Sequence, residues 1–298
     1  MFLEDKRSDF MKKYIKLFFT FLMMISITGC FKMDTMEDIK IYTTVYPIEY
    51  VTDYLYGNHS TIKSIYPNGV NVNNYELTNK QIKDYSSTNL FVFNGLDDEK
   101  NYVNKLFKYN KNIKIIDSTQ SMEYTNSVEE LWLDPSNYLM LAKNIKTGFE
   151  DYIDNHYLKD EINQNYEKLK IELSNIDAKF KSMSEKADNK TIVVSSDLFL
   201  FLEKYGFNVI SLEENDNLNE KTINTVKNLI KNNQISYIFI KQNEEVNNTI
   251  NTIKNETNVE LVTLHTISNL TDDERADKKD YISIMNDNLE LLKNELYN

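Results

Sequence analysis

The sequence YLKDEINQNYEKLKIELSNIDAKFKSMSEKA, residues 157–187, decides the fold. Its apolar residues recur at alternating steps of three and four, which places them on one stripe of an α-helix. They are Leu158, Ile162, Tyr166, Leu169, Leu173, Ile176, Phe180 and Met183. A helix of this length spans ~45 Å at ~1.5 Å per residue. A free coiled coil is one interpretation, but the apolar repeat is short, and we favour a spine that joins two lobes and packs on both.

Strand-like and helix-like segments alternate on both sides of this stretch. Strands are predicted at residues 39–44, 60–66, 90–93, 113–116, 191–194, 209–212, 235–240 and 259–264, with helices between them and a last helix at 281–296. Strict alternation implies right-handed crossovers and parallel sheets. We therefore predict an α/β fold with two lobes, residues 39–151 and 189–298, each a parallel four-stranded sheet with flanking helices. One long helix, 152–188, joins them.

The first thirty residues have the organisation of an export signal. Lysines precede an apolar run at 17–27 that is too short to span a bilayer, and Ile27-Thr28-Gly29-Cys30 closes it. This ending resembles a bacterial lipobox, in which the cysteine carries lipid; an uncleaved anchor is the alternative. Met11 begins a more usual signal than the first residue does. We expect a lipoprotein signal up to Cys30, a tether at 31–38 and a lipid anchor at the outer face of the cell membrane.

Composition and motifs exclude several classes of protein. The formal net charge of −12 argues against a nucleic-acid surface and weakly favours cationic ligands. Cys30 is the only cysteine, so intrachain disulfides and cysteine-rich zinc sites are excluded. The sequence has no glycine-rich phosphate loop and no Gly-x-Ser-x-Gly elbow. No nucleophile–base pair can be placed, and we predict that the protein is not an enzyme.

Ligands of parallel α/β sheets bind beyond the carboxyl ends of the strands. Two lobes that face each other across a spine bring such loops into one cleft. The candidates are residues 68–76, 117–132, 195–197 and His265. His265 ends an apolar strand, and its two interpretations are a structural histidine and a ligand. His59 is expected to be solvent-exposed, and His156 is expected to be a surface or packing residue.

Six sequence blocks occur in a fixed order after Cys30. They are YTTVYP (42–47), PNGVNVNNYE (67–76), LFVFNG (90–95), WLDP (132–135) followed by AKNI (142–145), KYGF (204–207) and DYISIMNDNL (280–289). In this order they resemble the metal-binding solute-receptor lipoproteins of bacterial ABC transporters, the zinc/manganese class with a helical spine. The resemblance implies modest lobe movement, a metal ion bound between the lobes without chemistry, and an ABC permease as the membrane partner.

The departures from this family fall on its metal ligands. Where the family has three histidines and a carboxylate, this chain has Asn73, Glu130, Ser196 (followed by Asp197) and His265. Imidazole favours zinc, whereas carboxylate and carbonyl oxygens favour harder ions such as Mn²⁺. We predict a mixed site from Glu130, His265 and Asp197, with Asn73 and Ser196 as weaker ligands. The alternative is a cleft that has lost its metal and binds a small polar ligand or docks a partner.

These observations predict an extracytoplasmic, lipid-anchored, monomeric receptor of an ABC importer. Its ligand is expected to be a divalent metal ion of the zinc or manganese class. The alternative function is that of a degenerate receptor serving as a surface adhesion or interaction protein, or binding a non-metal solute.

Overall fold

A computed structural model describes residues 36–96 and 98–297 of the chain. Within these ranges it contains two parallel sheets of four strands each, which confirms the predicted fold class. The predicted signal and Cys30 lie outside the described residues. Met36, which the sequence assigns to the tether, is only 1% exposed and belongs to the core. None of the helices within the described ranges combines the length and apolar composition that a bilayer crossing requires.

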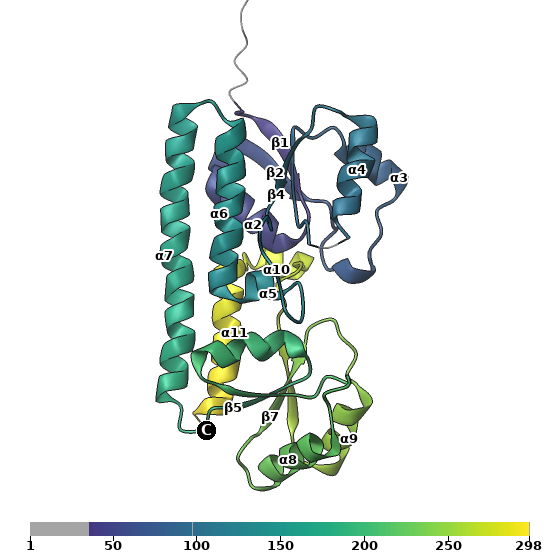
Figure 1. The fold of residues 1–298 in the computed structure, drawn as a ribbon, viewed down its shortest axis with the longest axis vertical. Coiled ribbons are helices and arrows are strands. Elements are labelled where there is room, and N and C mark those ends of the chain that lie inside the picture. Colours follow the sequence, from purple (N-terminus) through teal and green to yellow (C-terminus); the bar gives the residue numbers. More distant parts are fainter. Residues whose placement is uncertain (1–35, 97, 298) are drawn as a thin grey trace, which may run out of the picture. The chain divides into compact units, whose positions relative to one another are not determined.

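The N-terminal lobe is built on the first sheet (Figure 1). Its strands are β1 (Ile39–Thr43), β2 (Ser60–Ser64), β3 (Leu90–Phe93) and β4 (Lys114–Asp117), in the order β2-β1-β3-β4. The helices between them are α2 (Tyr46–Tyr56), α3 (Asn79–Tyr85) and α4 (Lys100–Tyr109), with short 3-10 turns at Gly57–His59 (η1) and Val72–Asn74 (η2). All four residues of β3 are buried, as expected of a central strand covered on both faces.

The C-terminal lobe repeats this topology. Its strands are β5 (Thr191–Val194), β6 (Asn208–Ser211), β7 (Tyr237–Lys241) and β8 (Glu260–Leu264), in the order β6-β5-β7-β8. The connections are η3 (Asp197–Tyr205), α8 (Glu220–Lys231) and α9 (Asn248–Glu256). The segment expected as an α-helix at 198–205 is the 3-10 helix η3, which ends at Gly206 in the left-handed conformation (φ 94°).

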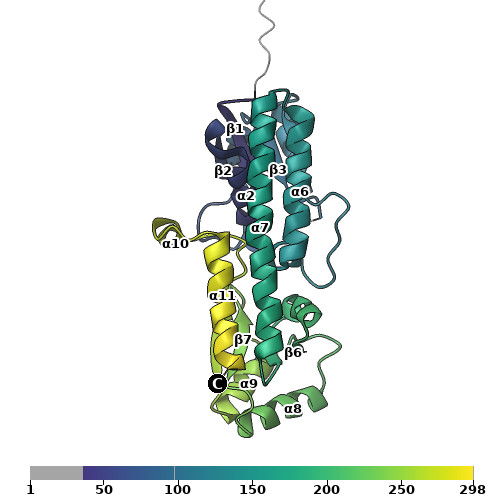
Figure 2. The ribbon, with the colours of Figure 1, turned by 90° about the vertical axis from the view of Figure 1, so that its left-hand side faces the viewer.

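Three long helices form one side of the molecule. They are α6 (Pro135–Tyr152), α7 (His156–Lys186) and α11 (Tyr281–Leu296), and α5 (Glu130–Leu133) leads into α6. Figure 2 shows α7 in front, with α6 beside its upper half and α11 beside its lower half. The spine therefore packs on elements of both lobes, as predicted. It begins at His156 rather than 152, because Asn155 caps it by accepting from the backbone N–H groups of Tyr157 and Leu158.

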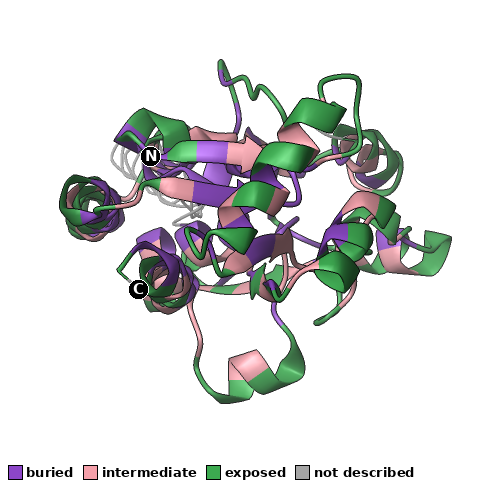
Figure 3. Ribbon diagram, turned by 90° about the horizontal axis from the view of Figure 1, so that it is seen from below, coloured by how far each residue is buried: buried purple, intermediate pink, exposed green. Residues whose placement is uncertain are grey.

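The predicted apolar stripe of α7 is its buried face, with Tyr166 only partly covered. The main core runs from the first sheet through α2, α6, α7 and α11 to the inner face of the second sheet. A smaller core lies between the second sheet and helices α8 and α9. In Figure 3 buried residues gather in the middle of the molecule, while the surrounding helices expose their outer faces. Among the strands, β1, β3 and β5 are mostly buried, and β2 has no fully buried residue. The carboxyl ends of both sets of strands are thus held over a common space.

Candidate functional site

A cavity of about 260 Å³ lies where strand-end loops of the two lobes meet. The N-terminal lobe contributes residues 70–74 and Glu129, and the C-terminal lobe contributes 241–244 and parts of 266–269. Amide side chains dominate its lining: Asn71, Asn73, Asn74, Gln242, Asn243 and Asn269. We call this space the inter-lobe cavity. Its wall offers many neutral hydrogen-bond donors and acceptors.

One ion pair bridges the two lobes inside this cavity. Lys241 Nζ lies 3.0 Å from Glu129 Oε1, and the two side chains are only 17% and 5% exposed. Lys241 is the last residue of β7 and its backbone N–H bonds to Ser195 Oγ, whereas Glu129 directly precedes α5. Burial by itself would raise the pKa of Glu129, but the charge of Lys241 and hydrogen bonds from Ser127 and Lys241 outweigh it. The pKa is lowered overall, so Glu129 is ionised at neutral pH.

Further hydrogen bonds at the cavity wall and beside it tie the lobes together. The side-chain amide of Asn269 donates to the carbonyls of Pro67 and Val70, at 2.7 and 3.1 Å. The backbone N–H of Gly69 donates to the Leu270 carbonyl at 2.8 Å. These bonds hold the loop that carries Asn73 against the segment that follows β8. Of the five predicted ligands, Asn73 is the one that lines the inter-lobe cavity.

Glu130 is buried but its carboxylate is used inside its own lobe. The carboxylate oxygens accept from the backbone N–H groups of residues 125–127 at 2.8–3.2 Å. Glu130 therefore caps the preceding loop, while its neighbour Glu129 lines the cavity. Side chains of adjacent residues at the start of a helix point about 100° apart. Glu129 and Glu130 therefore face different surroundings although they are neighbours in the sequence.

Ser196 and Asp197 belong to a network at the tips of β5 and β6. The Ser196 hydroxyl donates to Glu213 Oε2 at 2.9 Å, and the Asp197 backbone N–H donates to the same oxygen. Asp197 Oδ2 accepts from the side chain of Asn215 at 2.9 Å. Asp197 and Glu213 line a separate cavity of about 310 Å³. This network fixes the start of η3 and does not reach into the inter-lobe cavity.

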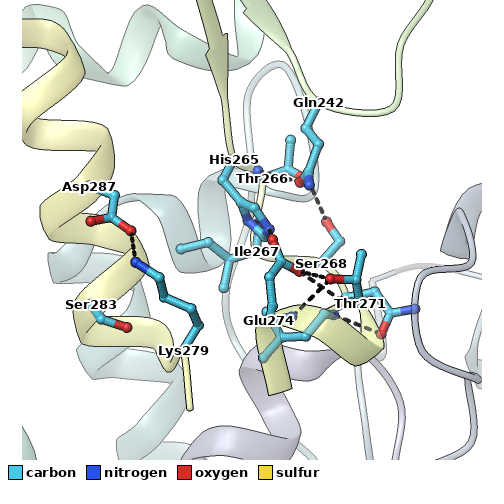
Figure 4. Close-up of polar contacts among 12 residues, drawn as sticks. Gln242, His265, Thr266, Ile267, Ser268, Thr271, Glu274, Lys279, Ser283 and Asp287 are labelled. Carbon is cyan, nitrogen blue, oxygen red and sulfur yellow. Dashed lines mark hydrogen bonds and ion pairs between the residues drawn. The ribbon is translucent and has the colours of Figure 1, made fainter. Parts of the chain in front are cut away.

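His265 is engaged at both ring nitrogens (Figure 4). Its Nδ1 accepts from the backbone N–H of Ile267 at 2.8 Å, so the proton resides on Nε2, which lies 3.1 Å from Glu274 Oε1. Ile267 has a φ of 64°, a strained conformation for a β-branched residue that the imidazole helps to hold. Burial lowers the pKa of His265 despite the opposing charge of Glu274. The ring is a neutral structural group in this arrangement.

The predicted ligands are therefore distributed over separate networks. In the described part of the chain, no three histidine, cysteine, aspartate or glutamate side chains are grouped so that they could hold a metal ion. As placed, the donor set does not fit a bound ion without rearrangement. The candidate loops 68–76 and 117–132 include Asn71, Asn73, Asn74 and Glu129, although Glu129 was not singled out as a ligand. The sequence reasoning missed Lys241 and the amides of Gln242, Asn243 and Asn269. Lys241 directly follows the predicted strand 235–240, so the rule that ligands bind beyond strand ends applies to it as well.

The helix α10 (Asp272–Ala276), which the sequence did not predict, supplies Glu274. It is only five residues long, and its start is fixed by a capping box between Thr271 and Glu274. Its Arg275 bonds to both carboxylate oxygens of Glu49 in α2, at 3.0 and 2.7 Å. This short helix therefore adds a further contact between the segment after β8 and the N-terminal lobe.

Comparison with known proteins gives a consistent family. Residues 41–295 match the family described as "ZnuA: Zinc-uptake complex component A periplasmic". The chain is 23% identical to the zinc-binding lipoprotein AdcA of Streptococcus pneumoniae, with 94% of this chain and 60% of that protein aligned. It is also 23% identical to the iron-binding protein YfeA of Yersinia pestis, over 69% of this chain and 70% of that protein. These names describe metal binding rather than catalysis.

Solved structures show the same fold. The Zn(II)-bound ZnuA-like domain of Streptococcus pneumoniae AdcA has a TM-score of 0.69 at 22% identity, covering 88% of this chain and all of that domain. A crystal structure of ZnuA has a TM-score of 0.69 at 17% identity and covers 87% of this chain. The chain spans about 60% of the length of the AdcA protein that it matches. The resemblance drawn from six sequence blocks is confirmed.

Proposed function

Because the chain belongs to the ZnuA family of zinc-uptake components, we propose that it is the solute-binding component of an ABC importer whose cargo is a divalent metal ion. The match over residues 41–295 carries this proposal. The inter-lobe cavity at the carboxyl ends of both sheets supports it, since that is where ligands of such sheets bind. The net charge of −12 also favours a cationic cargo.

The location and partners belong to the same proposal. A lipid at Cys30 would hold the receptor at the outer face of the cell membrane, where it would deliver its cargo to a permease. The large apolar core shared by the spine helices and both sheets favours a frame that moves little on binding. We expect a monomer, with zinc as the first ion to test and manganese as the second.

The ligand set remains the predicted one, Glu130, His265, Asp197, Asn73 and Ser196, and the structure adds Glu129 as a candidate. Glu130 would have to release three backbone N–H groups to reach an ion. His265 would have to release Glu274 or Ile267. Glu129 already lines the cavity and needs only to leave Lys241.

Equilibrium dialysis with elemental analysis tests the cargo, using Zn²⁺, Mn²⁺ and Fe²⁺ with metal-stripped protein. We expect one ion per chain at saturation for at least one of the three metals. Titration calorimetry of Glu129→Gln, Glu130→Ala, His265→Ala and Asn73→Ala then ranks the ligands, and we expect Asn73→Ala to have the smallest effect. Glu256→Gln, a carboxylate paired with Lys227 away from the cavity, is the matched control.

A protein that binds none of the three ions would contradict the metal cargo. The amide-rich wall of the cavity would then indicate a small polar solute held by hydrogen bonds. Equal affinities for all four cavity and ligand variants would contradict the ligand set while leaving the cargo in place.

A further inference from the structure

Lys241 is an unusual residue to find in a cavity assigned to cations. The charged side chains that line the inter-lobe cavity are Glu129, Glu244 and Lys241, so the lysine is the one cation among its described lining residues. A lysine ammonium has three donors and no acceptor, and it cannot ligate a metal ion. It is nevertheless 3.0 Å from Glu129, the least exposed carboxylate of that lining.

The burial of this pair separates it from surface ion pairs of the same kind. Lys227 and Glu256 lie 2.7 Å apart on α8 and α9, but Glu256 is 53% exposed, against 5% for Glu129. Exposed pairs are screened by solvent and contribute little. A buried carboxylate is costly unless it is paired or hydrogen-bonded. Glu130 is satisfied by backbone N–H groups, whereas Glu129 has the ammonium group of Lys241 as its counter-charge.

We infer that Lys241 is the resident counter-ion of Glu129 and sets the affinity of the cavity for metal ions. The inference rests on the proposed function. A divalent ion gains Glu129 only when the ammonium group leaves, because both positive charges would otherwise share one carboxylate at close range. The four-carbon side chain of lysine allows that movement at the cavity wall. Lys241 therefore acts as an internal competitor that weakens metal binding and favours release.

Titration calorimetry with Zn²⁺ and Mn²⁺ on Lys241→Met tests the inference. Methionine keeps an unbranched chain of similar length and removes the charge. We expect Lys241→Met to bind Zn²⁺ at least about tenfold more tightly than the wild type, which corresponds to about 1.4 kcal/mol. Lys241→Arg, which keeps the charge, is expected to stay within about threefold of the wild type. The matched control Lys227→Met is expected to change affinity by less than about twofold.

The double variant Glu129→Gln/Lys241→Met tests whether the tighter binding of Lys241→Met depends on the Glu129 carboxylate. It is expected to lose the gain that Lys241→Met shows, because the liberated Glu129 is what the ion binds. Circular dichroism establishes that each variant is folded. If Lys241→Met does not fold, Lys241→Gln replaces it, since glutamine is neutral and can still donate a hydrogen bond to Glu129.

The outcomes separate this inference from the proposed function. Zinc binding by Lys241→Met alone, without binding by the wild type, supports the inference and overturns the metal cargo. Unchanged or weaker binding by a folded, charge-free variant, with normal binding by the wild type, overturns the inference and leaves the cargo standing. Absence of binding in both proteins overturns both.

Discussion

The spine side and the cleft side of the molecule hold the two lobes together by different means. On the spine side, α7 buries an apolar stripe, and the ring of Phe180 stacks on Tyr205 with centroids 5.1 Å apart. On the cleft side, the contacts are hydrogen bonds and ion pairs around a cavity walled by amides. Apolar burial therefore fixes the frame, and polar groups that can exchange partners are left where a ligand would enter.

Trp132 lies between these two sides and should show the largest effect. It is 2% exposed, and its indole N–H donates to the Thr266 carbonyl at 2.8 Å. Trp132→Ala should lower the free energy of unfolding by about 3–5 kcal/mol, because it leaves a large cavity. Urea denaturation measures this, with exposed Met140→Ala expected to change stability by less than about 0.5 kcal/mol. A smaller loss of unfolding free energy for Trp132→Ala than for Met140→Ala would contradict the view that apolar burial fixes the frame.

Tyr281 gives the next largest effect and tests the buried polar contacts of the frame. Its hydroxyl donates to the Trp132 carbonyl at 2.6 Å, and its ring stacks on Tyr138 with centroids 4.1 Å apart. Tyr281→Phe keeps the stacking and leaves a buried carbonyl unpaired, which should destabilise the fold by about 1–3 kcal/mol. The control is Tyr157→Phe on the exposed start of α7, where thermal unfolding should be unchanged. Equal melting temperatures for both variants would contradict this account.

Arg275 tests the polar side. It forms two hydrogen bonds to the Glu49 carboxylate and a third to Asn68 Oδ1 at 2.7 Å. Arg275→Lys cannot reproduce this planar arrangement and should reduce stability by about 1 kcal/mol at low salt. The difference should shrink in 1 M NaCl, because partly exposed charges are screened. A loss of stability that does not depend on salt concentration would contradict the assignment of this contact to the screened, polar side of the molecule.

The smallest effect concerns two buried carboxylates at opposite ends of β7, whose pKa values are shifted in opposite directions. The pKa of Glu129 is lowered and that of Glu295 is raised. Glu295 accepts from the backbone N–H groups of Ser236 and Tyr237 at the start of the strand, and burial raises its pKa in spite of these bonds. The folded state therefore takes up this proton at higher pH than the unfolded state does. As pH falls from 7 towards 4.5, the wild type should gain stability relative to Glu295→Gln. Denaturation curves across this range test the sign, and an opposite trend would refute it.

Sequence reasoning succeeded where structure depends on local periodicity. The stripe of α7 and the alternation of strands with helices follow from spacing alone, and both are present as predicted. The short helix α10 was missed because its five residues carry no apolar period, although Thr271 and Glu274 form a readable capping box.

The candidate site was only partly accessible to this reasoning. The sequence predicted that Glu130 and His265 lie at the cleft. Whether a side chain can bind a ligand there also depends on the hydrogen bonds that it already makes. Loop amides attract the Glu130 carboxylate, and Ile267 and Glu274 occupy the His265 ring. Which of these groups bonds to Glu130 or His265 is decided by the folded structure and cannot be read from the sequence pattern. The pairing of Lys241 with Glu129 is of the same kind, since it joins residues from different lobes.

A crystal grown with zinc and measured at the zinc absorption edge tests the central claim directly. The account predicts an anomalous peak in the inter-lobe cavity, with a Glu129 oxygen about 2.0–2.2 Å from the ion. The ammonium group of Lys241 should have moved out of contact with that carboxylate. Peaks confined to the outer surface, with Lys241 still bonded to Glu129 at saturating zinc, would contradict the account.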